Sequence, residues 1–191
     1  MATFRERSIS AFRGKLTGGG ARSNLFEVDI TFPASVGPDA VRDEKVNFLC
    51  KAAEIPASNL GNIPVPYRGR VLPVAGDRTF DPWTVTIIND TDFIIRDAME
   101  KWSNSINDLQ TAQGTINPEV YQRSAQVKQL SREGSAPGDP EKTLRIYNFQ
   151  GIYPNTVSSI PLDFGATDQI EEFQVTFNYL FYEVAGPTGN F

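Results

Sequence analysis

The sequence predicts a mainly β domain of the α+β class, in which two packed antiparallel sheets form a sandwich or barrel and one amphipathic helix packs on them. Three observations support this class. Apolar and polar residues alternate with a period of two in several segments, turn residues separate these segments, and a single segment has helical periodicity. The chain has 191 residues, of which 40% are hydrophobic, enough for one domain with a full core.

The strands are expected from the alternation and from their boundaries. In residues 24–32, Phe26, Val28, Ile30 and Phe32 alternate with polar side chains, which is typical of a half-buried strand. Further strands are expected at residues 45–51, 79–88, 119–130, 142–153, 156–164 and 169–184. Residues 55–76 contain four prolines and three glycines and are therefore expected to form a long loop or an irregular hairpin.

The segment after residue 88 predicts the helix. Asn89 is expected at the N-cap, and Asp90 and Asp92 are favourable near the positive end of the helix dipole. The residues of its apolar stripe are Ile95, Ala98, Met99, Trp102, Ile106 and Leu109.

The composition excludes several kinds of chemistry. The chain has no histidine and one cysteine, which excludes a Ser-His-Asp or Cys-His nucleophile, a histidine metal site and an intrachain disulfide. The neighbouring carboxylates Glu171 and Glu172 would point to opposite faces of a strand, so they do not indicate an acid–base pair. Cys50 is expected in the core. We therefore predict no catalytic residue, no cofactor and no metal.

Charge divides the chain into an expected basic arm (1–22), a domain (23–185) and a short tail (186–191). The arm carries five basic and one acidic side chain, or +4, which leaves −9 on residues 23–191. An acidic domain is unlike a phosphate-binding surface, and the arm is expected to be flexible or to dock on a partner. No apolar run reaches 18 residues and the N-terminus lacks a signal peptide, so synthesis in the cytoplasm without membrane insertion is expected.

One block of residues resembles a known family. Residues 74–86 (VAGDRTFDPWTVT), followed by Asn89-Asp90 and the helix, resemble the tail tube proteins of T4-like contractile phages. The pieces at 24–28, 51–56, 121–124, 151–154 and 173–177 follow in the same order as in that family.

The resemblance implies a structural, non-enzymatic subunit of a virion. Six copies would form a ring in which strands of all subunits join an inner β-barrel, and rings would stack into a hollow conduit for DNA delivery into the host. The implied partners are further copies, the tail sheath protein, baseplate and tail terminator proteins, and the tape measure protein and then DNA in the lumen, without specific binding. Assembly would take place in the host cytoplasm.

Two sets of residues are expected at the contacts of such a tube. Those expected at a subunit or ring interface are Ile55, Pro56, Tyr67, Arg68, Arg70, Asp77 and Arg78. Those expected to face the lumen, as the polar face of one strand, are Gln122, Ser124, Gln126 and Lys128. For both sets, plain exposure to solvent is the alternative.

Other functions remain compatible with the sequence. The chain could be the inner tube of a non-phage contractile injection system that carries protein cargo. It could also be a monomeric ligand-binding β-sandwich, or a carboxylate-dependent hydrolase that uses Glu172.

Overall fold

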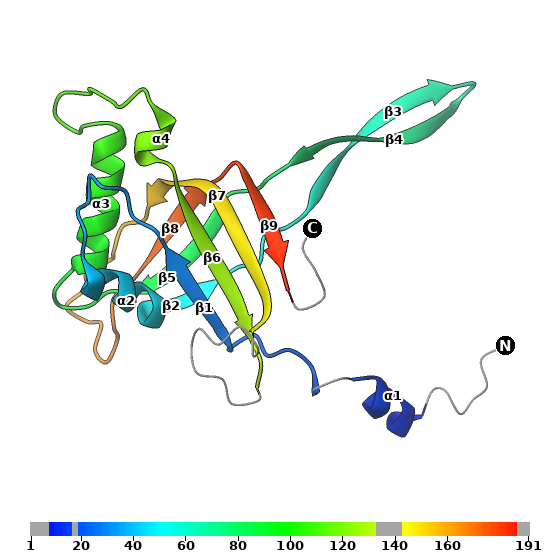
Figure 1. The fold of residues 1–191 in the computed structure, drawn as a ribbon, viewed down its shortest axis with the longest axis horizontal. Helices are drawn as coiled ribbons and strands as arrows, with labels where there is room; N and C mark the ends of the chain where they lie inside the picture. Colours follow the sequence, from blue (N-terminus) through cyan, green and yellow to red (C-terminus); the bar gives the residue numbers. More distant parts are fainter. Residues whose placement is uncertain (1–7, 17–18, 133–142, 187–191) are drawn as a thin grey trace.

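The computed structural model describes residues 8–16, 19–132 and 143–186. Two β-sheets form the body, most of the helices lie at one end, and a long hairpin projects from the other end (Figure 1). The elements in chain order are α1 (Ile9–Lys15), β1 (Phe26–Ile30), α2 (Ala40–Leu49), β2 (Cys50–Ala53), β3 (Asn59–Tyr67), β4 (Arg70–Thr79), β5 (Trp83–Ile88), α3 (Ile94–Ile106), α4 (Pro118–Tyr121), β6 (Arg123–Leu130), β7 (Thr143–Val157), β8 (Glu172–Asn178) and β9 (Phe181–Ala185).

The long strand β7 connects the two sheets. Its first part pairs with β6 and β9, and β6 pairs with β1, which gives sheet A the order β1-β6-β7-β9. Its last part pairs with β8, which gives sheet B the order β7-β8-β5-β2. Gly151 lies between the two parts with φ 69°, and a Cβ there would lie 2.7 Å from the side chain of Leu180. Glycine thus permits the change of direction that lets one strand serve both sheets.

Both sheets contribute aromatic side chains to one core. The Trp83 ring of sheet B stacks on Phe149 of sheet A with centroids 4.5 Å apart, and Phe177 packs beside Trp83 at 5.5 Å. Helix α3 adds four buried residues, Ile95, Ala98, Met99 and Trp102. The predicted class, two packed antiparallel sheets with an amphipathic helix, is confirmed.

The start of α3 differs from the prediction. Phe93 is the N-cap, in a left-handed conformation, and Asp92 Oδ1 accepts a hydrogen bond from the Ile94 amide at 3.2 Å. The prediction of Asn89 as N-cap is wrong, because its amide groups bind Glu171 instead, through the backbone at 2.8 Å and the side chain at 2.9 Å. At the other end the buried stripe stops before Leu109, which is 91% exposed.

The predicted strand at 45–51 is wrong for most of its length. Residues 40–49 form α2, and only Cys50–Ala53 form a strand. Asp39 starts this helix, because its Oδ1 accepts hydrogen bonds from the amides of Val41 (3.0 Å) and Arg42 (3.2 Å).

Several strand boundaries also move. The two strands expected at 142–153 and 156–164 are one continuous strand that ends at Val157, whereas 169–184 divides into β8 and β9. Residues 119–121 belong to α4, and β5 begins at Trp83 rather than at residue 79. The turn expected at 133–140 lies outside the described residues.

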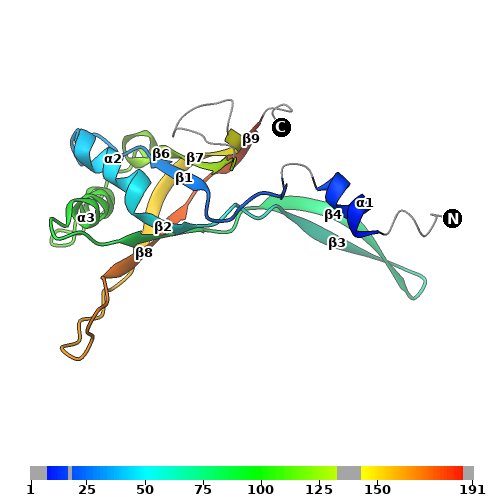
Figure 2. The ribbon, with the colours of Figure 1, turned by 90° about the horizontal axis from the view of Figure 1, so that it is seen from below.

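Residues 59–79 form a hairpin that projects from the sheets, and its register shifts between Leu60 and Asn62 (Figures 1 and 2). Its two-residue turn consists of Arg68 (φ 46°) and Gly69 (φ 81°). Two successive positive φ values are typical of a type I′ turn, whose twist matches that of the flanking strands. Of the two forms predicted for 55–76, the hairpin is thus the one observed.

Candidate assembly interfaces

The β3–β4 hairpin exposes apolar side chains on both faces. On one face Ile63 pairs with Val74 and Val65 with Leu72. On the other face Pro64 and Pro66 lie opposite Pro73 and Val71. Ile63, Val65, Leu72 and Val74 are 52%, 42%, 61% and 42% exposed. Monomeric soluble proteins rarely expose an apolar surface of this extent, so the hairpin is a candidate surface for contact with another chain.

The residues predicted at an interface lie along this hairpin and at its base. Tyr67, Arg68 and Arg70 form the tip, where the Arg68 guanidinium lies 5.3 Å from the Tyr67 ring centroid. At the base, Arg78 Nη1 donates to Ser58 Oγ at 2.7 Å. Residues 59–79 contain three arginines and one acidic residue, Asp77, so the hairpin carries a net positive charge.

The other two predicted interface residues, Ile55 and Pro56, precede β3. Ile55 is 51% exposed and Pro56 is half-buried. Five of the seven predicted interface residues thus lie on the projecting hairpin and two lie shortly before it, and their contact with another chain remains a prediction.

Sheet A ends in two unpaired strand edges. In the described part of the chain, β1 pairs only with β6 and β9 only with β7. The amide of Leu130 donates to Leu25 O (2.9 Å) and that of Thr31 to Ser124 O (3.0 Å) at the two ends of the β1–β6 ladder. Because the direction of hydrogen bonding alternates along an antiparallel strand, the peptide groups of Phe26, Val28 and Ile30 point away from β6, toward the free edge.

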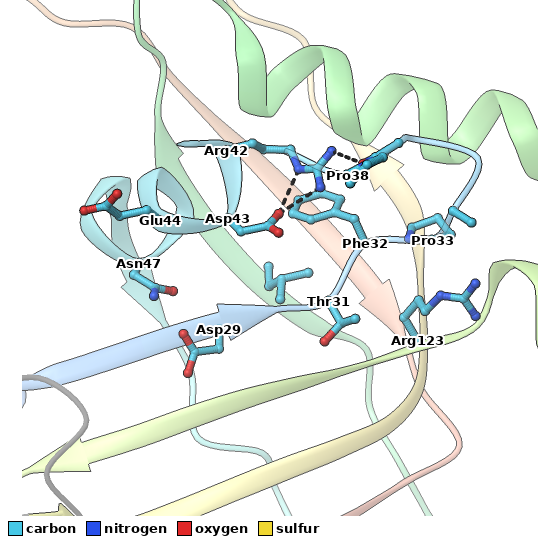
Figure 3. Close-up of a pocket in the computed structure, with 13 residues that line it drawn as sticks. Asp29, Thr31, Phe32, Pro33, Pro38, Arg42, Asp43, Glu44, Asn47 and Arg123 are labelled. Carbon is cyan, nitrogen blue, oxygen red and sulfur yellow. Dashed lines mark hydrogen bonds and ion pairs between the residues drawn. The ribbon is translucent and has the colours of Figure 1, made fainter. Parts of the chain in front are cut away.

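A groove of about 830 Å³ lies at the end of β1, where Asp29 and Ile30 are the β1 residues that line it. Its walls are β1 with the loop that follows it and α2, and Figure 3 shows Asp29 and Thr31 on one side and Glu44 and Asn47 on the other. Asn47 Oδ1 is buried with no hydrogen-bond partner among the described residues. Within the described ranges the groove therefore has one buried polar side-chain atom without a partner, close to the end of a strand that pairs on one side only.

Arg42 fixes the shape of this groove. Its Nε and Nη2 donate to Asp43 Oδ1 at 3.0 and 2.8 Å, and its Nη1 donates to the carbonyl oxygen of Gly37 at 2.9 Å (Figure 3). The guanidinium also lies 4.2 Å from the centre of the Phe32 ring. These contacts hold the loop after β1 against α2. Beside α2 the edge of β1 has no strand partner in the part of the chain that the structure describes, but Val28 and Ile30 are buried there in the single copy.

The outward side of sheet A is polar. Residues that pair across the strands share a face, and the apolar residues Ile146 and Ala185 lie on the side opposite the core. Nine more residues on that side are Glu27, Asp29, Ser124, Gln126, Lys128, Asn148, Gln150, Phe181 and Glu183. We call these nine residues the polar face. Three carboxylates and one ammonium give it a net charge of −2.

Lys128 is the cation of the polar face and is held by the carboxylates of β1. Its Nζ lies 3.5 Å from Glu27 Oε2 and also pairs with Asp29. Burial by itself lowers the pKa of Lys128, but the hydrogen bond to Asp29 and the charges of Asp29 and Glu27 outweigh it and hold the pKa above its usual value. Lys128 therefore stays charged through neutral pH.

Three of the four residues expected at the lumen share the polar face. Ser124, Gln126 and Lys128 point away from the core on β6, and their exposure to a lumen remains a prediction. Gln122 ends α4 before β6 begins, so it does not belong to the polar face of the strand.

Among the described residues there is no cluster of metal-binding side chains, since no three Asp, Glu or Cys side chains converge on a possible metal position. Cys50 is buried, and the loss of solvation raises the pKa of its thiol to about 12, so it remains a protonated core residue. None of the helices in the described ranges has the length and apolar composition to cross a bilayer.

The sequence did not reveal the two free strand edges. The period-two pattern that locates β1 and β9 does not say which strands pair with them. The alternating side chains of β6 were the one available signal for the polar face.

Two tail tube proteins of phages are similar to this chain over most of its length. The tail tube protein gp19 of Enterobacteria phage T4 is 32% identical over 167 residues, which cover 85% of this chain and 91% of that protein. The tail tube protein of Serratia phage KSP90 is 29% identical over 175 residues, covering 90% and 94%. Among solved structures, a chain of the anti-feeding prophage tube-terminating cap has a TM-score of 0.60 at 15% identity, covering 87% of this chain and 91% of that chain. A chain of the PVC contractile injection system sheath–tube complex has a TM-score of 0.55 at 12% identity, covering 94% and 98%; both support the fold. The sequence profile described as phage tail tube protein matches residues 21–185, and the chain therefore belongs to the phage tail tube protein family.

Proposed function

We propose that copies of this tail tube protein join head to tail through the two free edges of sheet A, six to a ring, and that the rings stack into a hollow conduit. The observation that carries the proposal is that β1 and β9, at opposite ends of one four-stranded sheet, are each unpaired on one side. Pairing β1 of one copy with β9 of the next satisfies both edges at every contact, and a repeated contact of this kind closes a ring.

In this arrangement the polar face lines the bore. The core side of sheet A is covered by sheet B and α3, so the polar face is the side left to solvent. Its net charge of −2 per copy gives a wall that repels DNA phosphates, and DNA passes without being held. The tape measure protein would occupy the same space before DNA does.

The hairpin extends the assembly beyond the ring. Its apolar faces are exposed in one copy and become buried when they pack on a neighbouring subunit or on the next ring. The opposite end of the molecule carries α3, whose exposed Asp97 and Glu100 are available to a sheath. The role is structural and non-enzymatic, as part of the virion tail, with sheath, baseplate and terminator proteins as further partners after assembly in the host cytoplasm.

Electron microscopy of the purified full-length protein tests the proposal. Negative-stain images at high protein concentration are expected to show rings with a central hole, or long tubes. A compact monomer under all conditions would contradict it and would favour the monomeric binding domain.

The free edge of β1 has its own test. Replacing Ile30 by proline removes an amide that points away from β6, so the β1–β6 hydrogen bonds remain while the edge loses a donor. We expect the Ile30→Pro protein to fold but to form no rings.

The matched control is Ile30→Ala, which removes a similar part of the buried side chain and keeps the amide. Circular dichroism checks the fold of both variants, and electron microscopy checks assembly. Rings of normal shape from the folded proline variant would show that the edge of β1 is not a subunit contact.

The charge of the bore can also be reversed. Gln126→Lys with Glu183→Lys changes the polar face from −2 to +1 per copy. We expect tubes that take up DNA oligonucleotides at low salt, protect them from nuclease and release them as salt rises, because phosphate binding is salt-dependent.

The control places the same change of charge on the exposed side of α3, as Asp97→Lys with Ser103→Lys. DNA bound there should remain sensitive to nuclease. Equal protection by both variants, or by neither, would contradict the position of the polar face in the bore.

A further inference from the structure

Helix α1 precedes the part of the chain that matches the family profile, and the assembly contacts proposed above do not use it. Ile9, Phe12 and Leu16 follow one another at helical spacing and are 87%, 66% and 45% exposed. Arg13 and Lys15 lie in its last turn, and it has no acidic residue in its first turn. α1 is thus a short basic helix with an apolar stripe that its own copy leaves uncovered.

A second exposed surface has the opposite charge. The loop at residues 158–171 exposes Leu162, Phe164 and Ile170, of which 81%, 112% and 72% are accessible. The loop has three acidic side chains and no basic one. Together with the adjoining Glu172 it encloses a cavity of about 540 Å³, whose walls include Ile160, Leu162 and Ile170.

We infer that α1 of one copy docks on the 158–171 loop of another copy. The inference rests on the proposed assembly, because it needs two copies held next to each other. The stripe of α1 meets the apolar side chains of the loop, and Arg13 and Lys15 meet the carboxylates of Asp163 and Asp168. Asp163 accepts one hydrogen bond, from the Gly165 amide at 2.8 Å, and Asp168 has no hydrogen-bond or ion-pair partner among residues 8–16, 19–132 and 143–186.

The two surfaces belong to different copies because of where they lie. In Figures 1 and 2, α1 is at the same end of the molecule as the hairpin, whereas the 158–171 loop is at the opposite end, beyond β8. In a head-to-tail assembly opposite ends of successive copies come together. The docking therefore links copies rather than folding the arm back on its own domain.

Two other exposed apolar surfaces, the hairpin and the loop after α3, suit α1 less well. The hairpin is basic and would repel Arg13 and Lys15. Leu109 and Ile116 are exposed on the loop after α3, but the carboxylate there is already used: Asp108 Oδ1 accepts from Thr111 N (2.8 Å), Thr111 Oγ1 (2.9 Å) and Gln110 N (3.0 Å). These bonds hold the pKa of Asp108 below its usual value.

A disulfide between copies tests the docking. Phe12→Cys is combined with Phe164→Cys in the full chain, where the native Cys50 is buried and protonated and does not interfere. After assembly and mild oxidation with diamide, we expect a ladder of covalent multimers on non-reducing gels. Mixing the two single-cysteine variants should give a covalent dimer, which shows that the bond joins two copies.

Phe12→Cys with Leu109→Cys is the matched control, since Leu109 is equally exposed on the other loop. A second test reverses the charges of the loop: Asp163→Lys with Asp168→Lys in the Phe12→Cys, Phe164→Cys chain should lose most of the cross-linked product. Tubes without the ladder, or an equal ladder from the control, would overturn the docking and leave the tube function intact. Absence of any assembly would overturn both.

Discussion

Tubes are expected to disappear when Val65 and Leu72 are both replaced by aspartate, while the single copy stays folded. The two side chains face each other across the β3–β4 hairpin and are 42% and 61% exposed, so they contribute little to the fold of one copy. Burying one such side chain contributes about 1.5–3 kcal/mol, and an unpaired carboxylate in its place must be desolvated at every contact. Because every copy makes the same contact, the loss repeats along the whole tube.

Sedimentation and electron microscopy measure the loss of tubes, and thermal unfolding followed by circular dichroism measures the stability of the single copy. Val65→Ile with Leu72→Ile is the control, because it keeps an apolar and β-favouring hairpin and should assemble normally. Normal tubes from the aspartate variant would show that this face of the hairpin stays in solvent.

The elements found from the sequence were those whose signal is local. The alternation in β1 and the stripe of α3 each reflect one face against one core, and such periodicity can be read from a short segment. α2 was missed because its apolar residues do not form a clear stripe. Its start depends on the Asp39 cap, which lies six residues before the segment predicted as a strand.

The surfaces were harder to predict than the core. The location of the interface on residues 55–78 came from the proline and glycine content and from the family resemblance, but the exposure of both hairpin faces depends on its projection from the sheets. The free edges of β1 and β9 follow from the strand order, which the bend at Gly151 helps to set by allowing β7 to pair with three strands. Such pairing is non-local, and no single segment of the sequence contains it.

Replacing Trp102 by alanine should destabilise the single copy more than any surface change. Trp102 is 0% exposed, and its ring lies 5.7 Å from that of Phe32 and 6.1 Å from that of Phe177, so the substitution leaves a cavity where α3 meets sheet B. Its Nε1 donates to the carbonyl oxygen of Tyr121 at 2.8 Å, which ties the end of α4 to the helix directly before β6 begins. Removing a buried aromatic side chain costs about 3–5 kcal/mol, against a usual total of roughly 5–15 kcal/mol for a domain.

Urea unfolding of dilute, unassembled protein measures this cost as a fall in the free energy of unfolding. Trp102→Phe keeps an aromatic ring but loses the hydrogen bond and part of the buried ring volume, so a smaller fall than for Trp102→Ala is expected. Leu109→Ala, at a residue that is 91% exposed, should change stability by less than about 0.5 kcal/mol. A loss in Trp102→Ala no larger than that of Leu109→Ala would mean that α3 is not part of the core. α3 would then not support sheet A from its core side. The unpaired edges of that sheet would not be held in position to pair with neighbouring copies in a ring.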